Sequence, residues 1–315
     1  MASKFAVVGC GLVGRAWAIS FARGGHEVAL YDPAAGAAEA AVAFARTVLP
    51  DLARNDLLRG QAPEAVLARL KPAASLEAAL DGAVHVQENT PEQVETKREV
   101  FARLDALAGP QTVLASSTSA ILPSAFTEAL PGRHRCVVVH PINPPYLVPA
   151  VEVVPAPWTD AGVVARTRDL MRELGQAPIV MKREIDGFVM NRLQGALLQE
   201  AFRLVAEGYA TTEDVDIGLC QGIGLRWAFI GPFETIDLNA PGGVRDYIER
   251  YEGLYKTLWR TQQHIVPWSG GLADQVEAER RQHLPADRLA GRPRGRDRRL
   301  MALVAHKRRA ESDIG

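Results

Sequence analysis

The chain has 315 residues, of which 47% are hydrophobic and 23% charged, with a net charge of −1 at pH 7. This composition is ordinary for a globular enzyme of two domains and excludes a fibrous or disordered chain. A near-zero net charge gives no electrostatic reason to expect a nucleic acid or an anionic membrane as a partner. We expect no signal peptide, because the first strand begins within a few residues of Met1, and no apolar run approaches the ~20 residues of a transmembrane helix. A cytoplasmic location follows as an expectation.

The first predicted strand runs directly into a glycine-rich turn, Phe5-Ala-Val-Val-Gly-Cys-Gly-Leu-Val-Gly14. In a dinucleotide-binding turn of this layout, Gly9 permits the tight turn and Gly11 lets a pyrophosphate approach the backbone. Gly14 lets the following helix pack closely on the strand, and the free N–H groups at the helix start face the anion. Leu12 and Val13, between these glycines, belong to the same predicted cofactor-binding segment.

A second strand, Glu27–Tyr31, ends in Asp32, about 20 residues after the glycines, as the fingerprint requires. A carboxylate there accepts hydrogen bonds from an adenosine ribose diol and repels a 2′-phosphate, and no arginine follows to offset that repulsion. The sequence therefore predicts NAD(H) as the cofactor. A glycine-rich turn for another ligand, including FAD, is the alternative.

Alternating strand and helix patterns continue after Asp32 and predict a doubly wound, Rossmann-type sheet over residues 1–185. At Thr90-Pro-Glu-Gln93 we predict a helix start, with Thr90 as N-cap and Gln93 closing a capping box. The predicted elements are a helix at 35–48, a polar, helix-compatible arm at 51–71, a strand at 84–87, a helix from Thr90 to 107, strands at 112–115, 136–139, 151–154 and 178–181, and a helix at 160–174.

Strand signals largely vanish in residues 186–315, which we predict to form a mostly α-helical second domain that begins with a long helix over 188–207. Eleven Lys or Arg residues lie between Arg280 and Arg309. Because Leu300, Met301, Leu303 and Val304 lie among them, we interpret this segment as an amphipathic helix with a solvated face.

Three widely spaced cysteines, Cys10, Cys136 and Cys220, show no metal-ligand pattern and are expected to be reduced, packed thiols. No metal site is predicted.

Two residues in apolar strands are candidates for catalysis. His140 lies where a strand ends, and ligands bind at the carboxyl ends of strands in open α/β sheets. Histidine is suited to take the proton of a secondary alcohol because its pKa lies near neutrality. Glu152, in another apolar strand, needs a partner, and pairing with His140 would fix the imidazole tautomer and stabilise the imidazolium.

Four segments carry a resemblance to a known family: Ser116-Ser-Thr-Ser119, Val137-Val-Val-His-Pro-Ile-Asn-Pro144, Val151-Glu-Val153 and Gly187-Phe-Val-Met-Asn-Arg192. With Gly222–Trp227 and Gly231–Ala240, they resemble the L-3-hydroxyacyl-CoA dehydrogenase superfamily, and within it the lambda-crystallin branch, whose members are L-gulonate 3-dehydrogenases. The resemblance extends nearly end to end.

This resemblance implies the same dyad roles for His140 and Glu152, and contacts of Ser119 and Asn191 with the reacting substrate oxygen. It further places Glu92, Lys97 and Ser117 beside the nicotinamide half of NAD, although the family's usual residue at the position of Ser117 is Asn. Relatives are dimers through the second domain, so a homodimer is expected.

The substrate is predicted from Arg226, whose planar guanidinium offers a fork for a free carboxylate. We expect a small L-3-hydroxy acid of the L-gulonate type, with Arg226 in a surface or interdomain ion pair as the structural alternative. Arginine and lysine residues of the 51–71 arm keep a second reading open, in which the substrate is a 3-hydroxyacyl-CoA or a carnitine-type compound. A third reading is a non-catalytic NAD(H)-binding or structural protein.

Overall fold

The computed structural model describes residues 3–314, which form two compact units. The first unit comprises residues 3–191 together with 297–314, and the second comprises 192–296. None of the helices formed by residues 3–314 combines the length and the apolar character needed to cross a bilayer.

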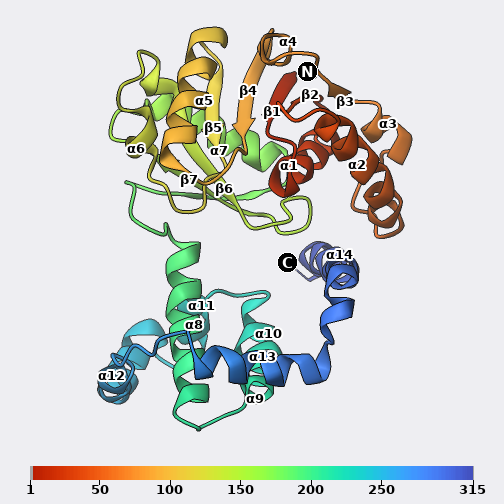
Figure 1. The fold of residues 1–315 in the computed structure, drawn as a ribbon. Helices are drawn as coiled ribbons and strands as arrows, with labels where there is room; N and C mark the ends of the chain where they lie inside the picture. The colour runs from red at the N-terminus through yellow and green to blue at the C-terminus, as the bar shows by residue number, and fades with distance from the viewer. Residues whose placement is uncertain (1–2, 315) are drawn as a thin grey trace. The chain divides into compact units, whose positions relative to one another are not determined.

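The first unit is built on an eight-stranded sheet with the order β3-β2-β1-β4-β5-β6-β7-β8 (Figure 1). Neighbouring strands are parallel except β6 and β7, which are antiparallel. The strands are β1 (Lys4–Val8), β2 (Glu27–Tyr31), β3 (Leu70–Pro72), β4 (Ala83–Glu88), β5 (Val113–Ser116), β6 (Cys136–Pro141), β7 (Ala150–Pro155) and β8 (Ala177–Val180).

Helices cover both faces of this sheet and bury one apolar cluster on each. One face carries α1 (Leu12–Arg23), α2 (Ala37–Arg54), α3 (Pro63–Leu67) and α7 (Ala161–Glu173), and the other carries α4 (Leu76–Leu80), α5 (Val94–Leu107) and α6 (Pro123–Thr127). Strand side chains alternate between these clusters: Phe5 and Val7 pack on the first face, and Ala6 and Val8 on the second. The prediction of a Rossmann-type doubly wound sheet is confirmed.

Of two local predictions, one is right in part and one is wrong. The expected helix-compatible arm at 51–71 contains the end of α2 and the short helix α3, but also the edge strand β3, whose pairing with β2 is a long-range contact that local sequence does not reveal. Thr90 does not cap α5, because the Glu88 carboxylate takes both its backbone N–H and its hydroxyl, and the helix begins instead at Val94 with Gln93 as N-cap.

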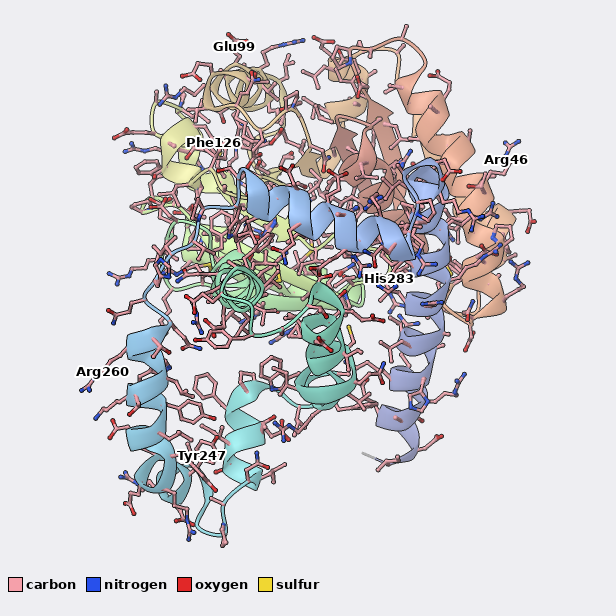
Figure 2. The ribbon with its side chains drawn as sticks, turned by 60° about the horizontal axis from the view of Figure 1, so that its bottom comes forward. Arg46, Glu99, Phe126, Tyr247, Arg260 and His283 are labelled. Atoms are coloured by element: carbon pink, nitrogen blue, oxygen red, sulfur yellow. The ribbon has the colours of Figure 1, made fainter. Side chains whose placement is uncertain are left out.

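The second unit is helical, as predicted, and begins within α8 (Met190–Ala206). It contains α9 (Thr212–Ile217), the π-helical segment η2 (Gly218–Ile223), α10 (Gly224–Trp227), α11 (Pro232–Leu238), α12 (Gly243–Thr261), α13 (Gly271–His283) and the 3-10 segment η3 (Ala286–Gly291). Figure 2 shows the aromatic side chains of α12, with Tyr247 labelled. They form a row along the helix, Tyr247, Tyr251, Tyr255 and Trp259.

The last helix, α14 (Arg292–Asp313), returns to the first unit. Met301 and Ala305 are buried in the cluster that contains α1 and α2, and Arg298 Nε pairs with Asp51 at 3.0 Å. The apolar side predicted around Leu300–Val304 therefore packs on this cluster, whereas the basic segment as a whole is divided among α13, η3 and α14 instead of forming one helix. The domain division at residue 185 remains a prediction. It placed the whole of 186–315 in the second domain and did not foresee that residues from Asp297 onward pack with the first unit.

Candidate active site

The glycine turn has the geometry that an anionic dinucleotide needs. Gly9 has φ +88°, and a Cβ there would lie 2.8 Å from the backbone of Asn89. A Cβ on Gly14 would lie 1.8 Å from the Gly9 carbonyl oxygen, so the close approach of α1 to β1 requires glycine. A Cβ on Gly11 would meet nothing within 4 Å, which leaves an open backbone face at the start of α1. No side chain caps this helix and its first turn holds no acidic residue, so its N-terminal N–H groups can bind an anion.

Asp32 lies directly after β2 and closes the same turn. Its Oδ2 accepts the backbone N–H of Cys10 at 2.7 Å, and its Oδ1 accepts that of Ala34 at 2.9 Å. A carboxylate has about four lone-pair sites, so acceptor capacity remains for a ribose diol. The residues present therefore fit NAD.

His140 and Glu152 face each other directly across the antiparallel β6–β7 pair. Both are buried, and Nδ1 of His140 lies 2.6 Å from Oε2 of Glu152. A carboxylate only accepts, so Nδ1 carries a proton, and in the neutral ring Nε2 is then the nitrogen with the free lone pair. This is the tautomer that a general base requires. The antiparallel turn of the chain at β7 brings the two residues together.

The second carboxylate oxygen of Glu152 accepts hydrogen bonds from the start of α8. Its Oε1 accepts the backbone N–H groups of Val189 at 2.6 Å and Met190 at 2.9 Å. Phe188, which precedes them, is fully buried with φ +50°, a conformation that costs a bulky residue about 1–3 kcal/mol. Its ring centroid lies 5.7 Å from that of His140. The strained turn at Phe188 places both N–H groups against Glu152. Neither the turn nor these hydrogen bonds were predicted from the sequence.

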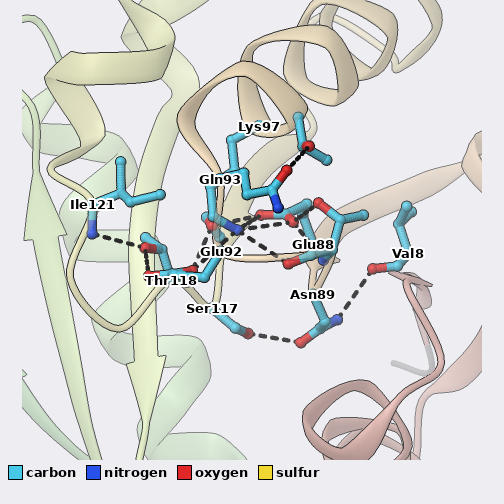
Figure 3. A network of polar contacts seen from close by, with 12 residues as sticks. Val8, Glu88, Asn89, Glu92, Gln93, Lys97, Ser117, Thr118 and Ile121 are labelled. Carbon is cyan, nitrogen blue, oxygen red and sulfur yellow. Dashed lines mark hydrogen bonds and ion pairs between the residues drawn. The ribbon is translucent and has the colours of Figure 1, made fainter.

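Ser119 lies in an exposed turn that Glu92 organises, and Figure 3 shows Glu92 beside Thr118, the residue before Ser119. Glu92 Oε1 accepts the hydroxyl of Thr118 at 2.5 Å and the backbone N–H groups of Ser119 and Ala120. Burial raises the pKa of Glu92, but these hydrogen bonds and the Lys97 cation together lower it. Asn191 Nδ2 donates to the Ser119 carbonyl oxygen at 2.6 Å. The structure thus brings the two predicted substrate contacts together.

Lys97 is 1% exposed and forms a buried ion pair with Glu88, which sequence reasoning missed. Its Nζ lies 3.1 Å from both Glu88 oxygens and 3.6 Å from Glu92. Ser116 Oγ also donates to Glu88 at 2.5 Å. The available signal was an acid at the end of an apolar strand followed nine residues later by a lysine on a helix face. Lys97 is therefore buried next to Glu92. The contact of Lys97 with the cofactor remains a prediction.

Ser117 is tied into the sheet by its side chain. Its Oγ accepts hydrogen bonds from Trp17 Nε1 at 3.0 Å and Gln87 Nε2 at 2.7 Å, and donates to Asn89 Oδ1 at 2.8 Å. The contact of Ser117 with the nicotinamide half of the cofactor remains a prediction.

Arg226 lies on α10 in the second unit, and its side chain is exposed. A hydrogen bond with Tyr255 raises the pKa of Tyr247, and the positive charge of Arg226 opposes that shift, so Arg226 lies near this tyrosine pair. Within residues 3–314 no carboxylate pairs with Arg226.

The three cysteines are free thiols. Cys10 and Cys136 are buried as predicted, and burial raises the pKa of each thiol to about 12, so neither is a reactive thiolate at neutral pH. Cys220 is exposed, contrary to the expectation of a packed thiol, and it lies in the segment η2, which has no buried residue.

Comparison with known proteins agrees with this geometry. Residues 4–185 match the NAD-binding domain of 3-hydroxyacyl-CoA dehydrogenase, and residues 187–268 match its C-terminal domain. Lambda-crystallin of Oryctolagus cuniculus is 41% identical over 97% of this chain and 96% of its own. L-carnitine dehydrogenase of Pseudomonas putida is 33% identical over 99% of this chain and 96% of its own.

Among solved structures, an NAD+-dependent 5-formyl-3-hydroxy-2-methylpyridine 4-carboxylic acid 5-dehydrogenase superposes with a TM-score of 0.79 at 28% identity, covering 99% of both chains. The chain therefore belongs to the 3-hydroxyacyl-CoA dehydrogenase family and is an NAD-dependent oxidoreductase that acts on a hydroxyl group.

Proposed function

We propose that this enzyme oxidises the 3-hydroxyl of a small L-3-hydroxy acid of the L-gulonate type to the 3-keto acid. The observation that carries the proposal is the buried His140–Glu152 pair at 2.6 Å, which leaves Nε2 of His140 as the proton acceptor. A non-catalytic NAD(H)-binding protein would not need this pair. Burying it without a function would cost free energy, because both groups leave water.

In this mechanism His140 Nε2 takes the proton of the C3 hydroxyl, and Glu152 stabilises the imidazolium that forms. The other oxygen of Glu152 accepts two backbone N–H groups at the start of α8, which fix the orientation of the carboxyl group toward His140. We assign the Ser119 hydroxyl and the Asn191 amide to hold the reacting oxygen as it changes from alcohol to ketone. The bound NAD supplies the hydride acceptor.

The turn from Gly9 to Gly14 would hold the pyrophosphate of NAD, with backbone N–H groups of Leu12 and Val13 at the start of α1. Asp32 would hold the adenosine ribose. We keep Glu92, Lys97 and Ser117 as the groups on the nicotinamide side. Repulsion between Asp32 and a 2′-phosphate favours NAD over NADP.

Two observations favour a free acid over a CoA thioester. Arg226 has no carboxylate partner among the described residues, which leaves its fork available for a substrate carboxylate. Of the four cations that could meet CoA phosphates, Arg54, Arg59, Arg69 and Lys71, the three arginines have internal partners: Arg54 pairs with Asp51, Arg59 donates to the Glu173 carbonyl, and Arg69 donates to Ala22 and Gln61. L-carnitine is also a 3-hydroxy acid, so the likeness to L-carnitine dehydrogenase makes it the second candidate substrate.

The deciding experiment follows NADH formation by the purified protein with matched L-gulonate, L-3-hydroxybutyrate, L-carnitine and L-3-hydroxybutyryl-CoA. We expect turnover of L-gulonate and weak activity on the thioester. A preference for the thioester would assign the enzyme to acyl-CoA chemistry, and NADH binding without turnover of any of the four compounds would contradict the proposed activity on small L-3-hydroxy acids.

Replacing Arg226 with alanine should raise the KM for the carboxylate substrate about 10- to 100-fold with a smaller change in kcat, because a charge-assisted hydrogen bond contributes about 1.5–3 kcal/mol. The KM of Arg226→Lys should lie between those of wild type and Arg226→Ala, because lysine keeps the positive charge but lacks the forked guanidinium. Arg260→Ala, an exposed arginine on α12 labelled in Figure 2, is the matched control. An unchanged KM in Arg226→Ala would show that this arginine does not bind the carboxylate.

We also propose a homodimer formed through the second unit. Several large apolar side chains of this unit are exposed, including Leu193, Leu225, Phe233 and Leu238, each by more than half. Exposed large apolar side chains in this number favour a protein interface on this unit. A sedimentation mass of one 34.1 kDa chain would contradict it. The cytoplasmic location remains a prediction.

A further inference from the structure

Gln87 is a fully buried amide in the middle of the sheet, and all its polar atoms have partners. Its Nε2 donates to the Val139 carbonyl oxygen at 3.2 Å and to Ser117 Oγ at 2.7 Å, and its Oε1 faces Nε2 of His85 at 3.1 Å. Because a carbonyl oxygen only accepts, the contact with Val139 fixes which end of the amide is the nitrogen. His85 must therefore donate from Nε2. Burial lowers the pKa of His85 to about 4, so the ring is neutral near pH 7.

The hydrogen-bond directions beyond Gln87 are fixed in the same way. Trp17 Nε1 can only donate, so Ser117 Oγ accepts from both Trp17 and Gln87 and gives its own proton to Asn89 Oδ1. Asn89 Nδ2 in turn donates to the Val8 carbonyl oxygen at 3.3 Å. Figure 3 shows this part of the network, from Ser117 through Asn89 to Val8.

This network joins the strand ends that carry the proposed chemistry. Val139 immediately precedes His140, and Val8 immediately precedes Gly9 of the glycine turn. Ser117 begins the turn that contains Ser119. Gln87 therefore connects the base, the cofactor turn and the nicotinamide-side serine, although its own side chain is sealed from solvent.

We propose that Gln87 is a positioning residue, which holds the end of β6 and Ser117 in fixed register with the glycine turn. The inference rests on the proposed function, because it requires His140 to act on a substrate beside a cofactor held at Gly9–Gly14. Gln87 touches neither substrate nor cofactor. It acts through Val139 and Ser117.

The test replaces Gln87 with methionine, which keeps the length of the side chain and removes the amide. We expect kcat to fall about tenfold or more, because small misplacements of reacting groups are costly, with the Kd for NADH changed less than about threefold. Val86→Ala is the matched control: Val86 is a fully buried neighbour on β4 whose side chain packs on the other face of the sheet. It should lower thermal stability and leave kcat within about twofold of wild type.

A double-mutant cycle with Ser117→Ala separates positioning from general weakening. If Gln87 acts through Ser117, the effects of the two substitutions on kcat should not add. Full activity of Gln87→Met or an equal kcat loss in Val86→Ala would overturn the positioning role, and additive effects in the cycle would overturn the route through Ser117. A wild-type enzyme inactive on every substrate tested would instead overturn the proposed function.

Discussion

Replacing His140 with asparagine should lower kcat by about 10³-fold, the range that general-base catalysis contributes. Asparagine can still donate a hydrogen bond to Glu152 from its amide, so the buried carboxylate keeps a partner and the fold is retained. The variant lacks the position of Nε2, the atom that takes the substrate proton. The affinity for NADH should stay near that of wild type, since the glycine turn is untouched.

Glu152→Gln provides the companion measurement. The glutamine oxygen can still accept the N–H groups of Val189 and Met190, but its amide nitrogen then faces Nδ1 of His140. This reverses the tautomer and places the ring proton on Nε2, where it blocks proton uptake. We expect a kcat loss of about 10²- to 10⁴-fold, as for a misoriented catalytic histidine. A His140→Asn enzyme that keeps a tenth or more of wild-type kcat would contradict the assignment of the base.

The predictable part of the fold is the part that local sequence determines. Apolar strand patterns and the Gly9–Gly14 turn depend on a few consecutive residues, so β1, β2, β4 and α1 lie where the sequence places them. His140 was recognisable because strand ends are where ligands bind in this type of sheet. The pairing with Glu152 followed from the need of a buried carboxylate for a partner.

The parts that were missed depend on contacts between distant residues. The antiparallel direction of β7 is set by the chain path between Pro141 and Ala150, which carries no local direction signal. Thr90 has the residue type of an N-cap, yet its backbone N–H and its hydroxyl both donate to Glu88, two residues earlier, and α5 begins only at Val94. Glu88 also forms a buried ion pair with Lys97, and the spacing of a capping box does not reveal such a contact.

Gly14 and Gly11 of the cofactor turn should have different roles, which two alanine substitutions can distinguish. Gly14 is required for the packing of the fold, and Gly11 for the binding of the cofactor. Gly14→Ala places a Cβ 1.8 Å from the Gly9 carbonyl oxygen. Because neither atom can move without the backbone, α1 must shift away from β1. We expect the free energy of unfolding to drop by about 3 kcal/mol, as for an overpacked core, with NADH binding lost as well.

Gly11→Ala should behave differently, because its Cβ enters open space and its φ of −66° suits alanine. The free energy of unfolding should stay within about 0.5 kcal/mol of wild type, as at a surface site. The Kd for NADH should nevertheless rise about tenfold or more, since the methyl group occupies the face that the pyrophosphate approaches. Denaturant unfolding and NADH fluorescence titration measure the two effects separately. Wild-type NADH affinity in Gly11→Ala would show that the pyrophosphate lies elsewhere, and wild-type stability in Gly14→Ala would show that α1 can shift without cost.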